Sequence, residues 1–266
     1  IARVNVQGTR NVLRGCRAGG VRCLVYTSSM EAVGPNTRGD PFLRGHEGSP
    51  YPVRHTEPYP LSKAQAERLV LEANGSTVLG GSRLVTLALR PTGIYGERHE
   101  LLAQLFRRGR AAGGLLPRVL PPHAEHGRVY VGNVAWMHVL AARAALGPGA
   151  EAVAGEVFYC YDWSPYAAYE DFNQLLLGPA GLRLRGPRLP PVLLELLARF
   201  NAGLGWLLRP WGGYTPLLTP YTLAVGSTPF SVRTDKAQRC FGYRPLFTWE
   251  EARGRTLAWL REIEGA

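Results

Sequence analysis

Apolar and polar residues along the first part of the chain follow the spacings of strands and helices. The segments VRCLVYTSS (residues 21–29) and RLVTLALRPTGIYG (residues 83–96) are short runs rich in apolar and β-branched residues. Such runs are typical of strands buried in a parallel sheet. Residues 1–18 and 60–74 instead space their apolar positions as helices do, and a glycine follows each segment. The pattern therefore predicts strands and helices that alternate along the chain.

The same alternation continues further along the chain. The pattern predicts a helix over residues 101–116, a strand that leads into a helix over 127–146 with Asn133 as its cap, a strand over 156–162 and a helix beginning at Tyr169. Strands alternating with helices are typical of a doubly wound α/β fold around a parallel sheet. Residues 30–57 are rich in glycine and proline and are predicted to form one long loop, a kind of segment that is often functional.

Leu189–Pro210 is the most apolar segment of the chain. Its length is close to the ~20 apolar residues that cross a bilayer. Glu195 and Arg199 lie inside it and would be costly in a membrane span. Two interpretations stay open: a helix in the membrane interface, with Trp206 and Trp211 near the headgroups, or a buried helix or substrate lid.

The chain has a formal net charge of +11, with 31 lysines and arginines in total. Only Lys63 and Lys236 are lysines, and the arginines are spread along the chain. No basic stretch interleaved with aromatic residues occurs, so we expect no nucleic-acid partner; attraction to an anionic membrane is equally compatible with the charge. The four cysteines have no metal-ligand spacing, which indicates reduced thiols in a cytosol-facing protein without a metal site.

Tyr59 and Lys63 are candidate catalytic residues. A phenol normally keeps its proton at neutral pH, with a pKa near ~10, but a nearby ammonium and a helix N-terminus favour the phenolate. If Pro60 begins the helix, Tyr59 and Lys63 lie one turn apart and can remove a proton from an alcohol. The spacing also fits an ordinary helix start, so the two residues alone leave both interpretations open.

Further candidates lie where the predicted strands end. Ser29 ends one strand, and the turn Pro91-Thr92-Gly93 ends the next. Because ligands bind outside the carboxyl ends of strands in doubly wound sheets, these residues would line one cleft. Serines also cap turns, so a structural role for Ser29 stays open. The Asn5 side chain either forms a hydrogen bond between helices or is a plain structural amide.

Five motifs occur in order along the chain: VNVQGTRNVL, LVYTSSMEAVGPN, YPLSKAQAE, LRPTGIYG and RVYVGNVAWMHVLAA. Together they resemble the extended short-chain dehydrogenases/reductases and, more narrowly, the 3β-hydroxysteroid dehydrogenase/isomerase family. The resemblance continues through VRTDKAQRCFGYRPLFTWEEA, close to the C-terminus. Within the family, the chain is most similar to the bile-acid branch, which acts on 7α-hydroxylated sterols.

The resemblance implies an oxidoreductase that converts the 3β-hydroxyl of a Δ5-sterol to a ketone with NAD and shifts the double bond from Δ5 to Δ4. It implies that Tyr59 is the base, that Lys63 lowers the pKa of Tyr59 and binds the nicotinamide ribose, and that Ser29 binds the substrate oxygen. The Pro91–Gly93 turn would lie near the nicotinamide. The resemblance assigns no acid or base to the double-bond shift.

The same resemblance implies an organisation in two parts. Residues 1–150 would be the remainder of a Rossmann-type dinucleotide-binding domain, and residues 151–266 a substrate-binding, membrane-associated region that returns to the core near 230–250. The corresponding expectations are a sterol substrate, membrane contact through 189–210 and a homodimer. We also expect the protein to lie on the endoplasmic reticulum membrane with the catalytic region facing the cytosol.

The chain also departs from the family pattern. It opens inside a predicted helix without a methionine, and neither a glycine-rich phosphate loop nor the acidic residue that selects NAD occurs where the family has them. We therefore expect an N-terminally truncated fragment with little activity alone. Two alternatives stay open: a sugar-nucleotide epimerase or reductase of the same superfamily, and a non-catalytic binding protein.

Overall fold

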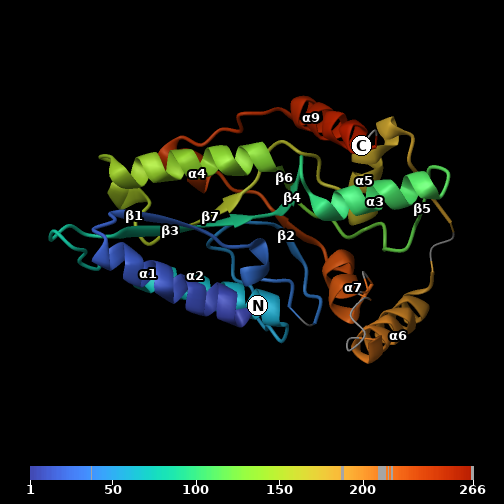
Figure 1. Ribbon diagram of the computed structural model, residues 1–266, viewed down its shortest axis with the longest axis horizontal. Helices are drawn as coiled ribbons and strands as arrows, with labels where there is room; N and C mark the ends of the chain where they lie inside the picture. Colours follow the sequence, from blue (N-terminus) through green and yellow to red (C-terminus); the bar gives the residue numbers. More distant parts are fainter. Residues whose placement is uncertain (37, 187–188, 209–213, 215, 217, 265–266) are drawn as a thin grey trace.

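The fold is built on a parallel sheet with helices on both faces. The computed structural model describes residues 1–36, 38–186, 189–208, 214, 216 and 218–264. The sheet has the order β1-β3-β7 and is formed by Cys23–Thr27, Val85–Pro91 and Val157–Cys160. Helices α1 (Gly8–Ala18) and α2 (Pro58–Glu72) lie on one face, and α4 (Val131–Leu146) lies on the other (Figure 1). The predicted doubly wound α/β fold class is confirmed.

Apolar side chains of β3 explain why this strand occupies the centre of the sheet. Leu87 and Leu89 point toward α4 and pack in one core with Val134 and Met137. Helices cover both faces of a parallel sheet, so a strand in its centre can bury a near-continuous apolar run. At the surface the same run would be exposed to water. On the other face the Thr86 hydroxyl is satisfied, because it donates a 2.6 Å hydrogen bond to the carbonyl of Val70 on α2.

A second group of elements packs beside the carboxyl ends of these strands. Its core is formed by α3, α5 and α9, which contact two short parallel sheets, β4-β6 and β5-β8. The bounds are α3 Glu100–Ala111, α5 Tyr169–Leu177, α9 Trp249–Glu262, β4 Gly93–Tyr95, β6 Arg128–Tyr130, β5 Leu115–Pro117 and β8 Arg183–Arg185. Short helical turns lie at Arg3–Gln7 (η1), Met30–Ala32 (η2), Ala150–Ala152 (η3) and Gly178–Ala180 (η4).

The C-terminal segment returns to the main sheet. Helix α8 (Lys236–Phe241) follows β9 (Phe230–Val232), and both Ala237 and Tyr243 are buried in the core around β3 and α4. β9 pairs in parallel with β2 (Phe42–Gly45). Residues 237–243 thus pack against the main core, while the division into two parts at residue 150 with a return near 230–250 stays a prediction.

Several predicted boundaries were wrong for local physical reasons. The second helix begins at Pro58 rather than Pro60, because a proline fits the first turn of a helix, where its missing N–H costs nothing. Helix α3 ends at Ala111 instead of continuing to residue 116, since Gly113 and Gly114 adopt positive φ angles of 67° and 86° and lead into β5. The run over 83–96 divides into β3 and β4, which belong to different sheets.

Two further predictions were also wrong. The predicted loop over residues 30–57 contains strand β2, whose Phe42 stacks on Phe230 with ring centroids 5.0 Å apart. Asn133 does not cap α4: the N-cap position is Tyr130, and the buried Asn133 side chain bonds Asp162 and Phe247 instead. Each error concerns a contact between distant segments, which local pattern does not encode.

Helix α6 (Pro191–Leu208) lies at the periphery, next to α7 (Pro220–Ser227) and away from both cores (Figure 1). Its mean hydropathy is 1.2, and among the described residues it is the one helix long and apolar enough to cross a membrane by length and composition. Only 11% of it is buried; Phe200 is 68% and Trp206 is 75% exposed. The interpretation of this helix as a buried core helix was therefore wrong. Arg209 and Trp211 lie outside the described residues.

Candidate active site

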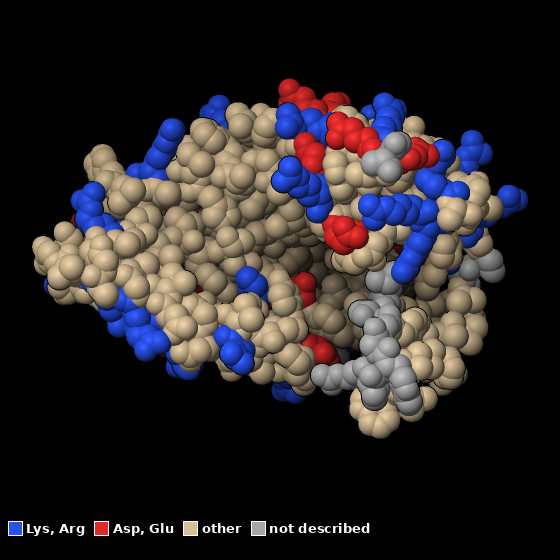
Figure 2. All heavy atoms as spheres, in the orientation of Figure 1, with Lys and Arg blue, Asp and Glu red and all other residues tan. Residues whose placement is uncertain are grey.

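A cleft of about 850 Å³ lies at the carboxyl ends of β1 and β3. Figure 2 shows the hollow in the middle of this face, between the main sheet with its helices and the group formed by α3, α5 and α9. All six residues singled out from the sequence line it: Ser29, Tyr59, Lys63, Pro91, Thr92 and Gly93. The structure thus brings together residues that lie up to 64 positions apart in the sequence.

Ser29 is fixed by the turn that follows β1. It is the N-cap of η2, with extended backbone angles, and its hydroxyl oxygen accepts a 3.1 Å hydrogen bond from the backbone N–H of Glu31. The residue therefore does cap a turn, as the structural interpretation expected. It also lines the cleft, so capping and substrate contact are compatible for this hydroxyl.

Tyr59 lies in the first turn of α2, where the helix dipole favours negative charge. The turn is held in place by Asn5, whose amide donates a 3.0 Å hydrogen bond to the hydroxyl of Ser62. Ser62 in turn donates a 2.8 Å bond to the carbonyl of Tyr59. Asn5 therefore forms a hydrogen bond between helices and so positions Tyr59, which is the first of its two expected roles.

Lys63 is one turn further along the same helix and points back toward the sheet. Its Nζ donates a 2.8 Å hydrogen bond to the carbonyl oxygen of Thr27 and lies 5.1 Å from the ring centroid of Tyr26. The Thr27 hydroxyl also hydrogen-bonds His138 of α4, with 2.7 Å between Oγ1 and Nε2. The end of β1 is thus tied to helices on both faces of the sheet.

The electrostatics of the pair depend mainly on burial. Burial raises the pKa of Tyr59, the nearby Glu31 carboxylate adds to the rise, and the Ser29 hydroxyl opposes it. Burial lowers the pKa of Lys63, which Glu67 partly opposes. Burial thus favours the protonated form of Tyr59, and besides Ser29 the groups of the chain that favour the phenolate are the helix N-terminus and the Lys63 ammonium.

Glu31 is a cleft residue that the sequence interpretation did not assign. It lies two positions after Ser29, and its carboxylate accepts a hydrogen bond from the hydroxyl of Tyr221 on α7. Burial raises the pKa of Glu31, while Tyr221 and His55 oppose the rise. The signal was its position two residues after Ser29, but only the fold shows that it lines the cleft.

The rest of the wall combines apolar and polar side chains. Apolar residues come from the segment around α3 and from β4, and the polar residues missed from the sequence are His99, Gln104, Arg128 and Asn173. These residues are spread over three elements, and no motif connects them in the sequence. Their arrangement suits a largely apolar ligand that carries a few oxygen atoms.

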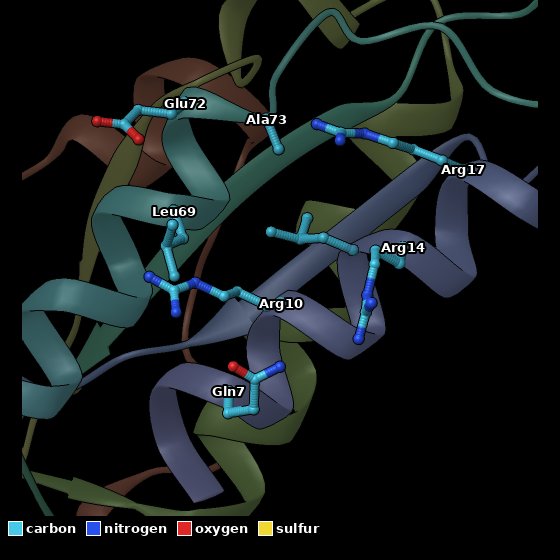
Figure 3. Close-up of a pocket in the computed structure, with 8 residues that line it drawn as sticks. Gln7, Arg10, Arg14, Arg17, Leu69, Glu72 and Ala73 are labelled. Atoms are coloured by element: carbon cyan, nitrogen blue, oxygen red, sulfur yellow. The ribbon is translucent and has the colours of Figure 1, made fainter. Parts of the chain in front are cut away.

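A second hollow, of about 380 Å³, lies on the outer surface between α1 and α2 (Figure 3). Arg10, Arg14 and Arg17 line it from α1, with Leu69 and Glu72 from α2. It contains none of the six predicted residues, so we take the cleft and not this hollow as the candidate active site.

Comparisons with known proteins show the family of this chain. Residues 1–191 match the sequence model of the 3-beta hydroxysteroid dehydrogenase/isomerase family. The chain is 61% identical to human 3 beta-hydroxysteroid dehydrogenase type 7, over 100% of this chain and 72% of that protein. It is 44% identical to the 3 beta-hydroxysteroid dehydrogenase/Delta 5→4-isomerase of vaccinia virus (strain Western Reserve), over 99% of this chain and 74% of that protein.

A solved structure of similar fold is the UDP-glucose 4-epimerase of Thermus thermophilus in complex with NAD. It is 20% identical, has a TM-score of 0.60, and the match covers 97% of this chain and 70% of that one. At this identity the likeness shows the Rossmann-type fold alone. The sequence matches are far closer, and they show that this chain belongs to the 3-beta hydroxysteroid dehydrogenase/isomerase family, a family of NAD-dependent oxidoreductases.

Proposed function

We propose that this protein oxidises the 3β-hydroxyl of a 7α-hydroxylated Δ5-sterol to the 3-ketone and then moves the double bond from Δ5 to Δ4. The observation that carries the proposal is the single cleft that joins Ser29, Tyr59 and Lys63 to an apolar wall. A sterol needs both parts, because its reacting hydroxyl must meet proton-transfer groups while its rings are removed from water.

The residues at the carboxyl end of the sheet fit the nicotinamide end of NAD. The buried Ser28 hydroxyl lines the cleft and has no hydrogen-bond partner among the described residues, so a polar group of a ligand can satisfy it. Lys63 would hold the ribose hydroxyls, and the Pro91–Gly93 turn would lie beside the ring. When bound, NAD accepts the hydride that leaves carbon 3 of the sterol.

The chain's own groups handle the proton of the alcohol. Tyr59 would remove it as the general base, while Ser29 donates a hydrogen bond to the substrate oxygen. Because burial raises the pKa of Tyr59, the phenolate depends on the helix N-terminus and on Lys63 for its stabilisation. Lys63 retains donors for this purpose, since its bond to Thr27 uses only one of three.

For the double-bond shift we propose Glu31 as the group that removes a proton from carbon 4 and returns it at carbon 6. Proximity to Ser29 supports this, since the new ketone acidifies the neighbouring carbon where its oxygen is held by a hydrogen-bond donor. The raised pKa of Glu31 brings the carboxyl closer to the working pH, where it both takes and gives a proton.

Membrane contact through α6 is the second part of the proposal. Lipid-soluble substrates reach an enzyme most directly from a bilayer, and the exposed apolar side chains of α6 suit the headgroup boundary. We place the protein on the endoplasmic reticulum membrane with the cleft facing the cytosol, as a homodimer. The exposed helix supports a sterol over a sugar nucleotide, which needs no lipid surface.

The proposal is tested by incubating the full-length enzyme with NAD and a 7α-hydroxylated Δ5-3β-sterol. We expect NADH and a conjugated 3-ketone to form together. NADH formation with a UDP-sugar and none with the sterol would contradict it.

A further inference from the structure

Arg128 lines the cleft and has no part in the chemistry assigned so far. It lies on β6, and its guanidinium stacks on two rings, with Cζ 3.8 Å from the ring centroid of Tyr169 and 5.3 Å from that of Phe172. Its Nε is buried without a hydrogen-bond partner in the described part of the chain. No described carboxylate pairs with it: the interaction that opposes the effect of burial on its pKa comes from Tyr169.

The contrast with Arg90 shows that a buried arginine without a carboxylate partner is unusual. Arg90 is also buried, but both of its bonds go to Glu67, with 2.9 Å between Nε and Oε2 and 2.5 Å between Nη2 and Oε1. A buried guanidinium stays charged, and for Arg128 the Tyr169 phenol takes the place of a carboxylate, so its desolvation is only partly compensated. Burial accordingly lowers the pKa of Arg128. A structural arginine is expected to resemble Arg90, so Arg128 is a candidate for ligand binding.

Its position within the cleft is set by a glycine. A Cβ added at Gly93 would lie 2.5 Å from Nη1 of Arg128, so only glycine leaves room for the guanidinium beside the turn after β3. Tyr169 lines, together with Ser29 and Thr92, a cavity of about 50 Å³ next to the cleft. The unpaired cation therefore lies near the end of the cleft where the 3β-hydroxyl would react.

The surroundings favour a neutral oxygen over an anion. Besides Arg128 the titratable cations on the cleft wall are Lys63 and His99, and burial together with the charge of Arg128 lowers the pKa of His99, which stays neutral. Glu31 adds a carboxyl group to the same wall. A phosphate or diphosphate would be expected to meet several positive groups together, and this wall instead offers one guanidinium and one ammonium with a carboxyl group and apolar side chains.

We propose that Arg128 determines substrate specificity by donating a hydrogen bond to a hydroxyl on the sterol rings, the 7α-hydroxyl of the proposed substrate. This inference rests on the proposed function. A sterol that lacks the hydroxyl would leave the guanidinium buried and unpaired, so the cleft would bind it poorly. The stack on Tyr169 restricts the positions that the guanidinium can take.

The test compares kcat/KM of the full-length enzyme for two Δ5-3β-sterols that differ only in the 7α-hydroxyl. We expect the wild type to prefer the hydroxylated sterol by roughly 10- to 100-fold, the value of one hydrogen bond to a charged group. In Arg128→Leu the preference should fall to near one. Arg128→Lys should keep part of the preference, and this variant still allows the measurement if Arg128→Leu does not fold.

Arg118→Gln is the matched control, because Arg118 also has a buried, unpartnered Nε but does not line the cleft. It should keep the wild-type preference. The role of Arg128 would be overturned by a wild type that does not prefer the 7α-hydroxylated sterol, or by an Arg128→Leu variant that keeps the full preference. In either case the proposed sterol oxidation would stand. Absence of any sterol oxidation by the wild type would instead show that the proposed function itself is wrong.

Discussion

Lys63 on α2 donates a 2.8 Å hydrogen bond to the carbonyl oxygen of Thr27 at the end of β1. This bond ties the helix that carries Tyr59 to the strand that leads into Ser29. Asn5 on η1 also bonds Ser62, which in turn bonds the carbonyl of Tyr59, so the first turn of α2 is held from a second side before a ligand binds. The site is thus preorganised by backbone carbonyls and amides as much as by side chains.

Replacing Tyr59 by phenylalanine should remove the base and leave the fold intact. We expect sterol oxidation to fall by about 10²- to 10⁴-fold, the usual contribution of general acid–base catalysis. NADH formation measures the loss, and an unchanged thermal unfolding temperature shows that folding is preserved. Tyr214→Phe, which changes an exposed phenol in the C-terminal region, is the control. Retained turnover in Tyr59→Phe would contradict the role.

Lys63→Met should shift the pH dependence of oxidation. Burial and Glu31 raise the pKa of Tyr59, and without the ammonium only the helix N-terminus and Ser29 favour the phenolate. The rising limb of the pH–rate profile should therefore move to higher pH. A profile of unchanged position and lower height would show that Lys63 acts only on cofactor binding.

Glu31→Gln should separate the two reactions. Starting from the Δ5-3-ketone, isomerisation should fall by at least about 10²-fold, while NADH formation from the alcohol changes much less. The matched control is Glu57→Gln, at the start of α2. Equal losses in both reactions would indicate a general disturbance of the cleft.

The same substitution gives a stability prediction. Because the pKa of Glu31 is raised in the folded protein, its contribution to stability is present at low pH and is lost as the pH rises through the folded value. The free energy of unfolding of Glu31→Gln should therefore increase relative to that of the wild type as the pH rises above ~4.3, the ordinary pKa of a glutamate, as measured by urea unfolding. A difference independent of pH would contradict the raised pKa.

Asn133→Ala should destabilise the fold. The buried amide accepts bonds from the backbone N–H groups of Leu246 and Phe247, both at 2.9 Å, and donates a 2.8 Å bond to Asp162. At about 1 kcal/mol for each bond and more for the charged acceptor, we expect a loss of about 3 kcal/mol in urea unfolding. Gln7→Ala, which removes an exposed amide from η1, should cost far less.

Charge on the outer side of α6 should weaken membrane binding. Phe200→Asp places a carboxylate on an exposed apolar helix, so sedimentation with neutral phospholipid vesicles should fall. Leu79→Asp is the control, because Leu79 is exposed to a similar extent, 71%, in a turn at the far end of the main sheet. Equal binding by the two variants would place the membrane contact elsewhere.

The sequence by itself determined the fold class and the candidate residues. Buried parallel strands produce apolar runs, and helices produce their own periodicity, so β1, β3, α2 and α4 could be predicted from local pattern. Ser29, Tyr59 and Lys63 were found because strand ends and helix starts are the places where doubly wound folds bind ligands. Strand β2 was missed because its pairing with β9 depends on a segment almost 190 residues away.

Only the tertiary structure decided what surrounds those residues. Whether a carboxylate such as Glu31 or a guanidinium such as Arg128 is buried, paired or left without a partner depends on elements that meet in space and not in sequence. The same holds for Asn133, which looked like a helix cap and instead joins three segments. Local periodicity reports which face of an element is apolar, whereas the energy of a buried polar group depends on its neighbours, and these are fixed only when the chain has folded.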